Sequence, residues 1–286
     1  IAECRSAKVP LLLVNARLSE KSAQKFARVP ALTGPALAGL TQIAAQTEGD
    51  AQRLESLGAP AVEIMGNLKF DIAPPPALLQ LGAEFRQGFG ATRPLFLAAS
   101  TRDGEEALLL DALSSVTIPG LLTVIVPRHP QRFDAVAQLL AARGIPFQRR
   151  SENRPVLPET QVVLGDSMGE MFAYYAACDV AFIGGSLLPY GAQNLIEAAC
   201  LGKPVLIGVH TYNFAEATEL AIEAGAARRV ADGAELTWEL GILLKDPVQR
   251  TAMAQAGLRF TEQHRGATAR LMALIAPYLD GYSISP

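Results

Sequence analysis

The chain has 286 residues, half of them hydrophobic, which is more than one ordinary hydrophobic core requires, so we expect two domains. Its formal net charge is −3 and its pI is near 5.7; this balance argues against a nucleic-acid partner, because nucleic-acid-binding proteins usually carry a basic face. Charges, prolines or glycines interrupt every hydrophobic run before about 18 residues, which excludes a membrane span within this sequence.

Cysteine and histidine are too sparse to predict a metal site. The three cysteines, Cys4, Cys178 and Cys200, are odd in number and widely spaced, which favours reduced thiols in a cytosolic compartment. No cysteine or histidine cluster has the spacing of zinc ligands. We therefore expect neither a metal nor a cofactor.

Short apolar runs alternate with helical patterns along the chain, which is typical of βαβ units and a parallel sheet. Most of these runs lack polar and apolar alternation, so helices should cover both faces of each sheet. The predicted fold class is α/β with Rossmann-like parallel sheets. The strands are expected at residues 10–15, 42–46, 61–65, 94–100, 121–127, 145–149, 161–165, 179–184 and 204–208.

Three consecutive prolines at residues 74–76 favour an extended linker and predict a domain boundary near residue 71. Residues 1–70 carry about three strands and form only part of a domain. Residues 71–286 form a second domain, closed by two consecutive helices. Because the chain begins at Ile1 without an initiator Met, we expect it to belong to a longer protein.

Ligands of open α/β sheets bind beyond the carboxyl ends of the strands, and four of the loops that follow predicted strands carry residues suited to ligand binding. Ser100 and Thr101 precede a helix that opens with two acids. They either cap this helix, whose dipole favours the acids, or contact an anion or a sugar. Arg128 and His129 follow the next strand, and Arg128 is either a solvated side chain or a guanidinium that binds a phosphate or carboxylate.

A third loop carries Met168, Gly169 and Glu170 behind the strand at residues 161–165. Gly169 would let a flat group approach the backbone, and the thioether of Met168 could pack against that group. The alternative is that Met168 simply fills the core.

The fourth loop, "GGSLLPYGAQNLIE", places Asn194 and Glu197 on one face of the following helix. It is either a capped helix whose dipole favours its Glu, or a site where helix-start amides bind a phosphate and the carboxylate binds ribose hydroxyls. The chain has no G-x-G-x-x-G fingerprint, no Walker motif and no G-x-S-x-G elbow, which argues against a dinucleotide dehydrogenase, a P-loop NTPase and a serine hydrolase. The residues alone predict a nucleotide-sized site in the second domain.

A series of motifs extends through nearly the whole chain. It includes "LLLVNARLSEKSAQKF", "GNLKFD", "AASTRDGEE", "VIVPRHPQRF", "VVLGDSMGEM" and "FIGGSLLPYGAQNLIEAACLGKPVLIG", in this order. In these motifs the chain resembles 3-deoxy-D-manno-octulosonic acid (Kdo) transferases, which are GT-B glycosyltransferases of lipopolysaccharide biosynthesis. The resemblance implies inverting transfer of Kdo from CMP-Kdo to a lipid A precursor, without a metal, at the cytoplasmic face of the bacterial inner membrane.

The resemblance also assigns roles to individual residues. Lys69 would stabilise the transition state, Glu197 would accept the ribose hydroxyls, and Arg128 with helix-start amides would neutralise the phosphate. Possible further donor contacts are Ser100, Thr101, Gly185 and Ser186. The CMP contacts would be Pro127, Arg128, Met168, Gly169, Glu170, Asn194, Leu195, Ile196 and Glu197.

The chain departs from the family pattern in several places. Gln193 and Arg102 stand where many relatives have His, and Ala198 stands where many have Pro. The general base of the family, a Glu, and the segment through which the family associates with the membrane are expected outside these 286 residues, so this chain alone should be inactive. Two other interpretations stay open: a non-catalytic nucleotide-binding fragment, and a UDP-sugar transferase or epimerase of the same fold.

Overall fold

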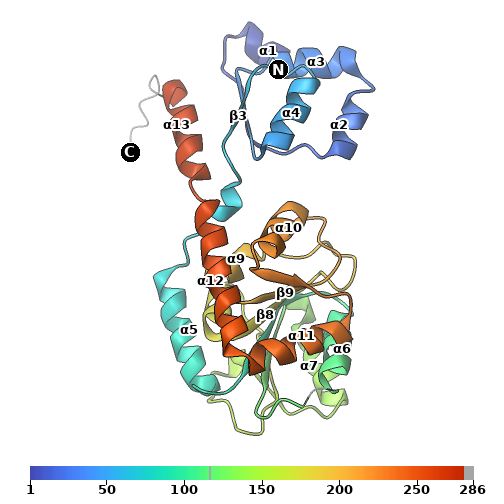
Figure 1. Cartoon of the computed structure of the whole chain (residues 1–286), viewed down its shortest axis with the longest axis vertical. Helices are drawn as coiled ribbons and strands as arrows, with labels where there is room; N and C mark the ends of the chain where they lie inside the picture. Colours follow the sequence, from blue (N-terminus) through green and yellow to red (C-terminus); the bar gives the residue numbers. More distant parts are fainter. Residues whose placement is uncertain (116, 280–286) are drawn as a thin grey trace. The chain divides into compact units, whose positions relative to one another are not determined.

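The computed structural model describes residues 1–115 and 117–279, which divide into two compact units (Figure 1). The first unit comprises residues 1–72 together with the chain from Gln263 onward, and the second comprises residues 73–262. The boundary near residue 71 therefore matches the start of the proline linker. The closing helices differ from the prediction, because the last one is grouped with the first unit.

The first unit contains a parallel three-stranded sheet in the order β1-β2-β3. Two of its helices, α2 and α4, begin at cap positions that the sequence supplies, since the Ser19 and Thr47 side chains accept hydrogen bonds from backbone N–H groups of their first turns. Its elements are α1 (Ala2–Ser6), β1 (Leu12–Ala16), α2 (Glu20–Phe26), α3 (Pro30–Ala38), β2 (Gln42–Ala45), α4 (Glu48–Ser56), β3 (Val62–Ile64), the 3₁₀ helix η1 (Leu68–Phe70) and α13 (Ala267–Leu279).

Helix α13 joins the first unit through apolar and polar contacts. Ala267 and Leu274 form one buried cluster with Ala44 and Met65. The Arg270 guanidinium Nε also donates to the Met65 carbonyl at 2.7 Å. These contacts lie between residues about 200 positions apart, so the local pattern, which predicted one domain over residues 71–286, assigned this helix wrongly.

The second unit is built on a parallel seven-stranded sheet in the order β10-β9-β8-β4-β5-β7-β6. The strands are β4 (Leu95–Thr101), β5 (Leu122–Pro127), β6 (Phe147–Arg149), β7 (Val162–Leu164), β8 (Val180–Ile183), β9 (Val205–Ile207) and β10 (Ala227–Arg229). The central strands β4, β5 and β8 are almost fully buried, as their continuous apolar sequences predict. Strand β10 was not predicted, because its three residues at the sheet edge include two arginines.

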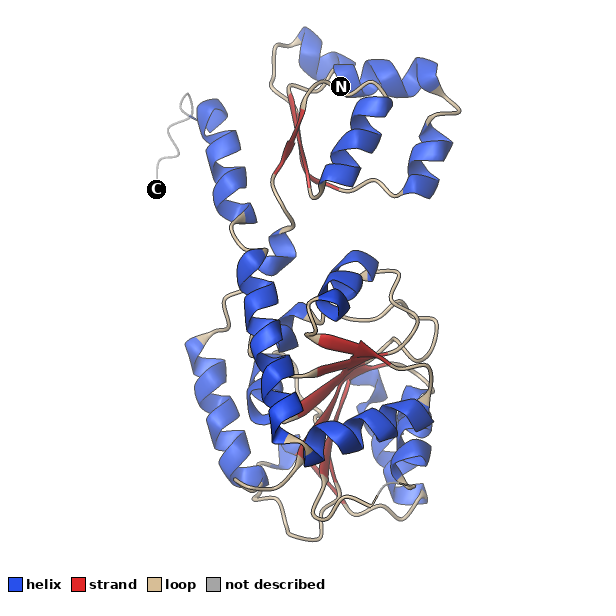
Figure 2. Cartoon of the chain, in the orientation of Figure 1, coloured by secondary structure: helices blue, strands red, loops and turns tan. Residues whose placement is uncertain are grey.

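Helices cover both faces of this sheet (Figure 2). Helix α5 packs on α8, where the Phe85 and Tyr174 rings lie 5.1 Å apart between centroids, and α11 packs on α6. The remaining elements of the unit are α5 (Pro76–Phe89), α6 (Glu105–Leu113), η2 (Pro130–Arg132), α7 (Phe133–Ala142), η3 (Arg150–Glu152), α8 (Met171–Ala177), α9 (Ile196–Ala199), α10 (Ala215–Glu223), α11 (Gly233–Lys245) and α12 (Pro247–Gln263).

The strand order places a switch point between β4 and β8. Strand β5 continues from β4 in one direction along the sheet, whereas β8, β9 and β10 extend in the other. Connections leave the sheet in opposite directions at such a point, which opens a crevice beyond the carboxyl ends of the strands. The two loops after β4 and β8, at Ser100 and Gly184, therefore lie where a ligand site is expected.

Candidate functional site

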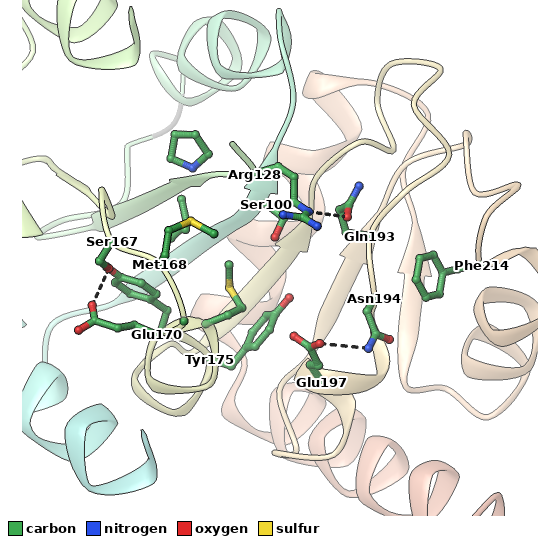
Figure 3. A pocket seen from close by; sticks show the side chains of 15 residues that line it. Ser100, Arg128, Ser167, Met168, Glu170, Tyr175, Gln193, Asn194, Glu197 and Phe214 are labelled. Carbon is green, nitrogen blue, oxygen red and sulfur yellow. Dashed lines mark hydrogen bonds between the residues drawn. The ribbon is translucent and has the colours of Figure 1, made fainter. Parts of the chain in front are cut away.

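A cavity of about 350 Å³ lies at the carboxyl ends of the central strands (Figure 3). Its walls come from the ends of β4, β5 and β7 and from the start of α9, and its size is within the usual range for small-ligand sites. The lining residues are Ser100, Val126, Pro127, Arg128, Ser167, Met168, Gly169, Glu170, Met171, Tyr174, Tyr175, Gln193, Asn194, Glu197 and Phe214.

The loop after β7 is open toward the cavity and anchored from behind. Met168 is 59% exposed, and a Cβ on Gly169, which has φ +79°, would meet nothing within 4 Å. The Glu170 carboxylate accepts hydrogen bonds from Ser167 Oγ at 2.5 Å and from Arg150 Nη2 at 3.1 Å. Glu170 therefore fixes the loop, while Met168 and the Gly169 backbone form a surface on which a flat group can rest.

The start of α9 carries a carboxylate that faces the cavity (Figure 3). Glu197 Oε1 accepts a hydrogen bond from Asn194 Nδ2 at 3.2 Å, and Asn194 Oδ1 accepts one from the Ile196 N–H at 3.1 Å. Burial raises the pKa of Glu197, although the Asn194 hydrogen bond and the Arg128 charge oppose this shift. Asn194 thus orients a carboxylate that can accept hydrogen bonds from a pair of vicinal hydroxyls.

Arg128 supplies positive charge to the same cavity. Its backbone N–H extends the β4–β5 ladder by donating to the Thr101 carbonyl at 3.0 Å, and its Nε donates to Gln193 Oε1 at 3.2 Å. Among the described residues its guanidinium has no carboxylate within ion-pair distance. Gln193 therefore orients the Arg128 group without neutralising it, which suits an anionic ligand.

The glycine loop after β8 has a different role from the one predicted. A buried carboxylate, that of Glu105, accepts hydrogen bonds from the backbone N–H groups of Arg102, Gly185, Ser186 and Leu187 at 2.6 to 3.0 Å. Burial raises the pKa of Glu105, and these four hydrogen bonds oppose the shift. Because the carboxylate occupies the loop's amides, they are not available to a phosphate.

The serine and threonine hydroxyls beside this loop are also occupied. Ser186 is fully buried; its hydroxyl donates to the Ile183 carbonyl at 2.5 Å and accepts from the Gly208 N–H at 2.8 Å. Thr101 is fully buried as well, and its hydroxyl donates to Glu106 Oε1 at 2.8 Å. We therefore do not retain Thr101, Gly185 or Ser186 as donor contacts. Ser100, which lines the cavity, is retained.

The structure brings most of the other predicted residues together. Pro127, Arg128, Ser100, Asn194 and Glu197 line the cavity, as do residues 168–170. Leu195 and Ile196 are fully buried and are not among the lining residues, so we do not retain them as CMP contacts. Sequence reasoning missed Tyr175 and Phe214 in the lining, the anchor Arg150 and the buried Glu105; no local motif distinguishes these from ordinary core or surface residues.

Lys69 belongs to the first unit, in the 3₁₀ helix η1. The Asn67 side chain caps this helix by accepting a hydrogen bond from the Lys69 N–H at 3.0 Å. Burial and the nearby charge of Arg17 lower the pKa of the Lys69 ammonium. Its catalytic role stays a prediction.

The described residues show neither a metal-binding cluster nor a membrane-spanning helix. Residues 1–115 and 117–279 contain no group of three or more His, Cys, Asp or Glu side chains arranged to hold a metal ion. Within the same residues, no helix combines the length and the apolar character needed to cross a bilayer.

Similar solved structures define the class of fold. The UDP-glucose complex of HepE from Anabaena is 17% identical and aligns with 98% of this chain and 75% of its own, with a TM-score of 0.57. The C-terminal CMP-Kdo binding domain of WaaA from Acinetobacter baumannii is 30% identical and aligns with 64% of this chain and 97% of its own, with a TM-score of 0.62. With parallel sheets flanked by helices in two units, the chain has the GT-B fold of glycosyltransferases.

Sequence relatives define the family more narrowly. Residues 1–72 match the family model for 3-deoxy-D-manno-octulosonic-acid transferase (kdotransferase). The 3-deoxy-D-manno-octulosonic acid transferases of Bordetella pertussis and Haemophilus influenzae are 42% and 36% identical over 98% and 95% of this chain. The chain belongs to this Kdo transferase family. It spans 66% and 65% of the length of these two relatives, just under two thirds.

Proposed function

We propose that this chain supplies the donor site of a glycosyltransferase that moves Kdo from CMP-Kdo to a lipid A precursor in lipopolysaccharide biosynthesis. One observation carries the proposal: the three segments that the resemblance assigned to CMP, at residues 127–128, 168–170 and 194–197, contribute side chains to one cavity. The relatives named as Kdo transferases support the sugar. The similarity to the CMP-Kdo binding domain from Acinetobacter supports the CMP-linked donor.

Each part of the cavity has a chemical task in this proposal. The Glu197 carboxylate, oriented by Asn194, accepts hydrogen bonds from the two ribose hydroxyls, and the base rests on Met168 and Gly169. The Arg128 guanidinium, oriented by Gln193, binds the phosphate. A general base takes the proton of an acceptor hydroxyl, and the hydroxyl oxygen attacks the anomeric carbon of Kdo from the face opposite to the phosphate. The bond from that carbon to the phosphate oxygen breaks, and CMP departs with the bonding electrons.

Arg128 has its largest effect while this bond breaks, because negative charge accumulates on the departing phosphate. Lys69 is the second cation of the proposal, with the transition-state role that the family resemblance implies for it. We also propose that the lipid nature of the acceptor places the reaction at the cytoplasmic face of the bacterial inner membrane.

Calorimetry with CMP and UDP tests the donor assignment. The wild-type chain should bind CMP more tightly than UDP. Tighter binding of UDP would favour a UDP-sugar transferase or epimerase and overturn the Kdo assignment.

An assay of Kdo transfer from CMP-Kdo to a lipid A precursor, in the native protein, tests the reaction. Lys69→Ala should lower kcat roughly a hundredfold or more and leave CMP affinity unchanged, since loss of a transition-state cation costs about 2.7 kcal/mol or more. Lys25→Ala, in α2 of the same unit, is the control and should retain full activity. Equal rates for Lys69→Ala and wild type would remove Lys69 from the mechanism.

A further inference from the structure

Arg102, directly after β4, holds a positive charge that no neighbouring acid of the described chain neutralises. Its guanidinium carbon lies 4.7 Å from the centroid of the Tyr190 ring, and the Tyr190 hydroxyl donates to the Asp103 carbonyl at 3.2 Å. Among the described residues the Arg102 guanidinium forms no ion pair. The ring therefore orients the guanidinium and leaves its charge and its N–H groups available.

Not every arginine near the end of β4 lacks an ion pair. Arg132 forms ion pairs with both Asp103 and Glu106, so its charge is compensated within the protein. Arg102 shares a loop region with these acids but is not paired with either of them. Arg102, after β4, and Arg128, after β5, thus each carry a positive charge that no carboxylate of the described residues pairs with, and both lie at this end of the sheet.

Arg102 lies next to Gly185 and Arg128 next to Gln193, and Gly185 and Gln193 are neighbours in space. A Cβ on Gly185 would lie 3.3 Å from Arg102 Cγ and 3.5 Å from Gln193 Nε2. The other end of the Gln193 amide accepts the hydrogen bond from Arg128. Desolvation lowers the pKa of the exposed His129 imidazole, and the charges of Arg102, Arg128 and Arg132 lower it further, which agrees with a shared electrostatic environment.

The proposed donor has two anionic groups on one carbon atom. In CMP-Kdo, the anomeric carbon carries both the phosphate ester and the carboxylate of the sugar acid. Arg128 lines the nucleotide cavity, whereas Arg102 is not among its lining residues and lies next to Gly185, close to the Gln193 amide. We propose that Arg102 forms a second anion subsite that binds the carboxylate of the donor sugar and selects sugar acids over neutral sugars.

This inference rests on the proposed function and makes a separate prediction. CMP lacks the carboxylate and CMP-Kdo carries it, so the two ligands should report on the two arginines separately. Arg102→Gln should weaken CMP-Kdo binding about tenfold, the usual size of a lost charge-assisted contact, and change CMP binding less than about twofold. Arg128→Gln should weaken the binding of both ligands.

The measurement is calorimetry with CMP and freshly prepared CMP-Kdo on wild type and variants, with melting temperatures recorded. Arg143→Gln is the charge-matched control, because Arg143 pairs with the exposed Asp111, and it should bind both ligands like wild type. If Arg102→Gln does not fold, Tyr190→Leu, which removes the ring that orients Arg102, should give a smaller loss confined to CMP-Kdo.

The outcomes separate this inference from the proposed function. Equal losses for CMP and CMP-Kdo in Arg102→Gln, or no loss for either, would overturn the carboxylate subsite and leave the CMP site intact. If the wild-type chain binds neither ligand, the proposed function itself fails.

Discussion

The loop after β7, at residues 167–170, and the loop after β8, at residues 184–187, both follow a buried strand and both combine glycine with serine. In the first loop the glycine faces open space, and Gly169 could carry a Cβ without meeting any atom within 4 Å. In the second loop, a Cβ on Gly184 would lie 2.4 Å from the Ser100 carbonyl oxygen. The first glycine leaves room for a ligand, whereas the second leaves room for the protein's own backbone.

The polar groups of the two loops differ in the same way. Glu170 anchors its loop through side chains only, so the backbone of that loop can still contact a ligand. Glu105 instead occupies the amides of Gly185, Ser186 and Leu187. A glycine-rich turn after a parallel strand is therefore not a phosphate site when the fold supplies a carboxylate of its own to those amides.

The largest effect on folding is expected from Gly184→Ala. The new methyl group would collide with the backbone of Ser100 and Thr101, which cannot give way as a flexible side chain can. We expect a loss of roughly 3 kcal/mol or more in the free energy of unfolding, measured by urea denaturation. A stability near that of wild type would show that the two backbones are not packed as closely as the structure places them.

Glu105→Gln should have the next largest effect. Its amide keeps the shape of the side chain but loses the charge and turns N–H donors toward backbone N–H groups, which should cost about 2 kcal/mol of stability. Because the loop leads to Gln193 and Asn194, CMP affinity should fall as well. Glu106→Gln is the matched control: it is equally buried but bonds to Thr101 and Arg132, so it should lose stability and keep CMP affinity. Equal CMP affinities in the two variants would contradict a positioning role for Glu105.

Glu197→Gln should weaken CMP binding about tenfold without destabilising the fold, since the carboxylate is the proposed acceptor of the ribose hydroxyls. The pKa of Glu197 is raised by burial, with opposing contributions from Asn194 and Arg128. As the pH falls, Glu197 therefore loses its charge at a higher pH than an exposed Glu does. CMP affinity should start to decline at a pH above the ordinary pKa of a Glu side chain. CMP itself also titrates, so the informative quantity is the difference between the pH profiles of wild type and Glu197→Gln. Parallel profiles would exclude Glu197 from ribose recognition.

Gly169→Ala should have only a small effect on stability. The left-handed conformation at φ +79° would be strained by about 1 kcal/mol with any side chain, but no atom blocks the methyl group. If Gly169 supports the base, CMP affinity should fall more than this modest loss of stability explains. Calorimetry and urea denaturation on the same variant would test this, and unchanged affinity would remove the loop from the nucleotide site.

Sequence patterns predicted the framework well, because continuous apolar runs are a strong signal for buried parallel strands. The nine expected strands all appear, and each of the four candidate loops contributes at least one residue to one cavity. Local patterns failed where the role of a residue depends on the direction of its side chain or on contacts with residues distant in the sequence. Nothing local shows that the Thr101 and Ser186 hydroxyls turn inward, or that Glu105 bonds to amides 80 to 82 positions away. The strand β10 and the grouping of α13 with the first unit likewise depend on tertiary contacts.

A crystal structure of the chain with CMP would test the central claim most directly. We expect the ribose hydroxyls to contact Glu197, the phosphate to contact Arg128, and the amides of Gly185, Ser186 and Leu187 to remain bonded to Glu105. CMP bound with its phosphate on those amides, or bound outside the cavity, would contradict the proposed donor site.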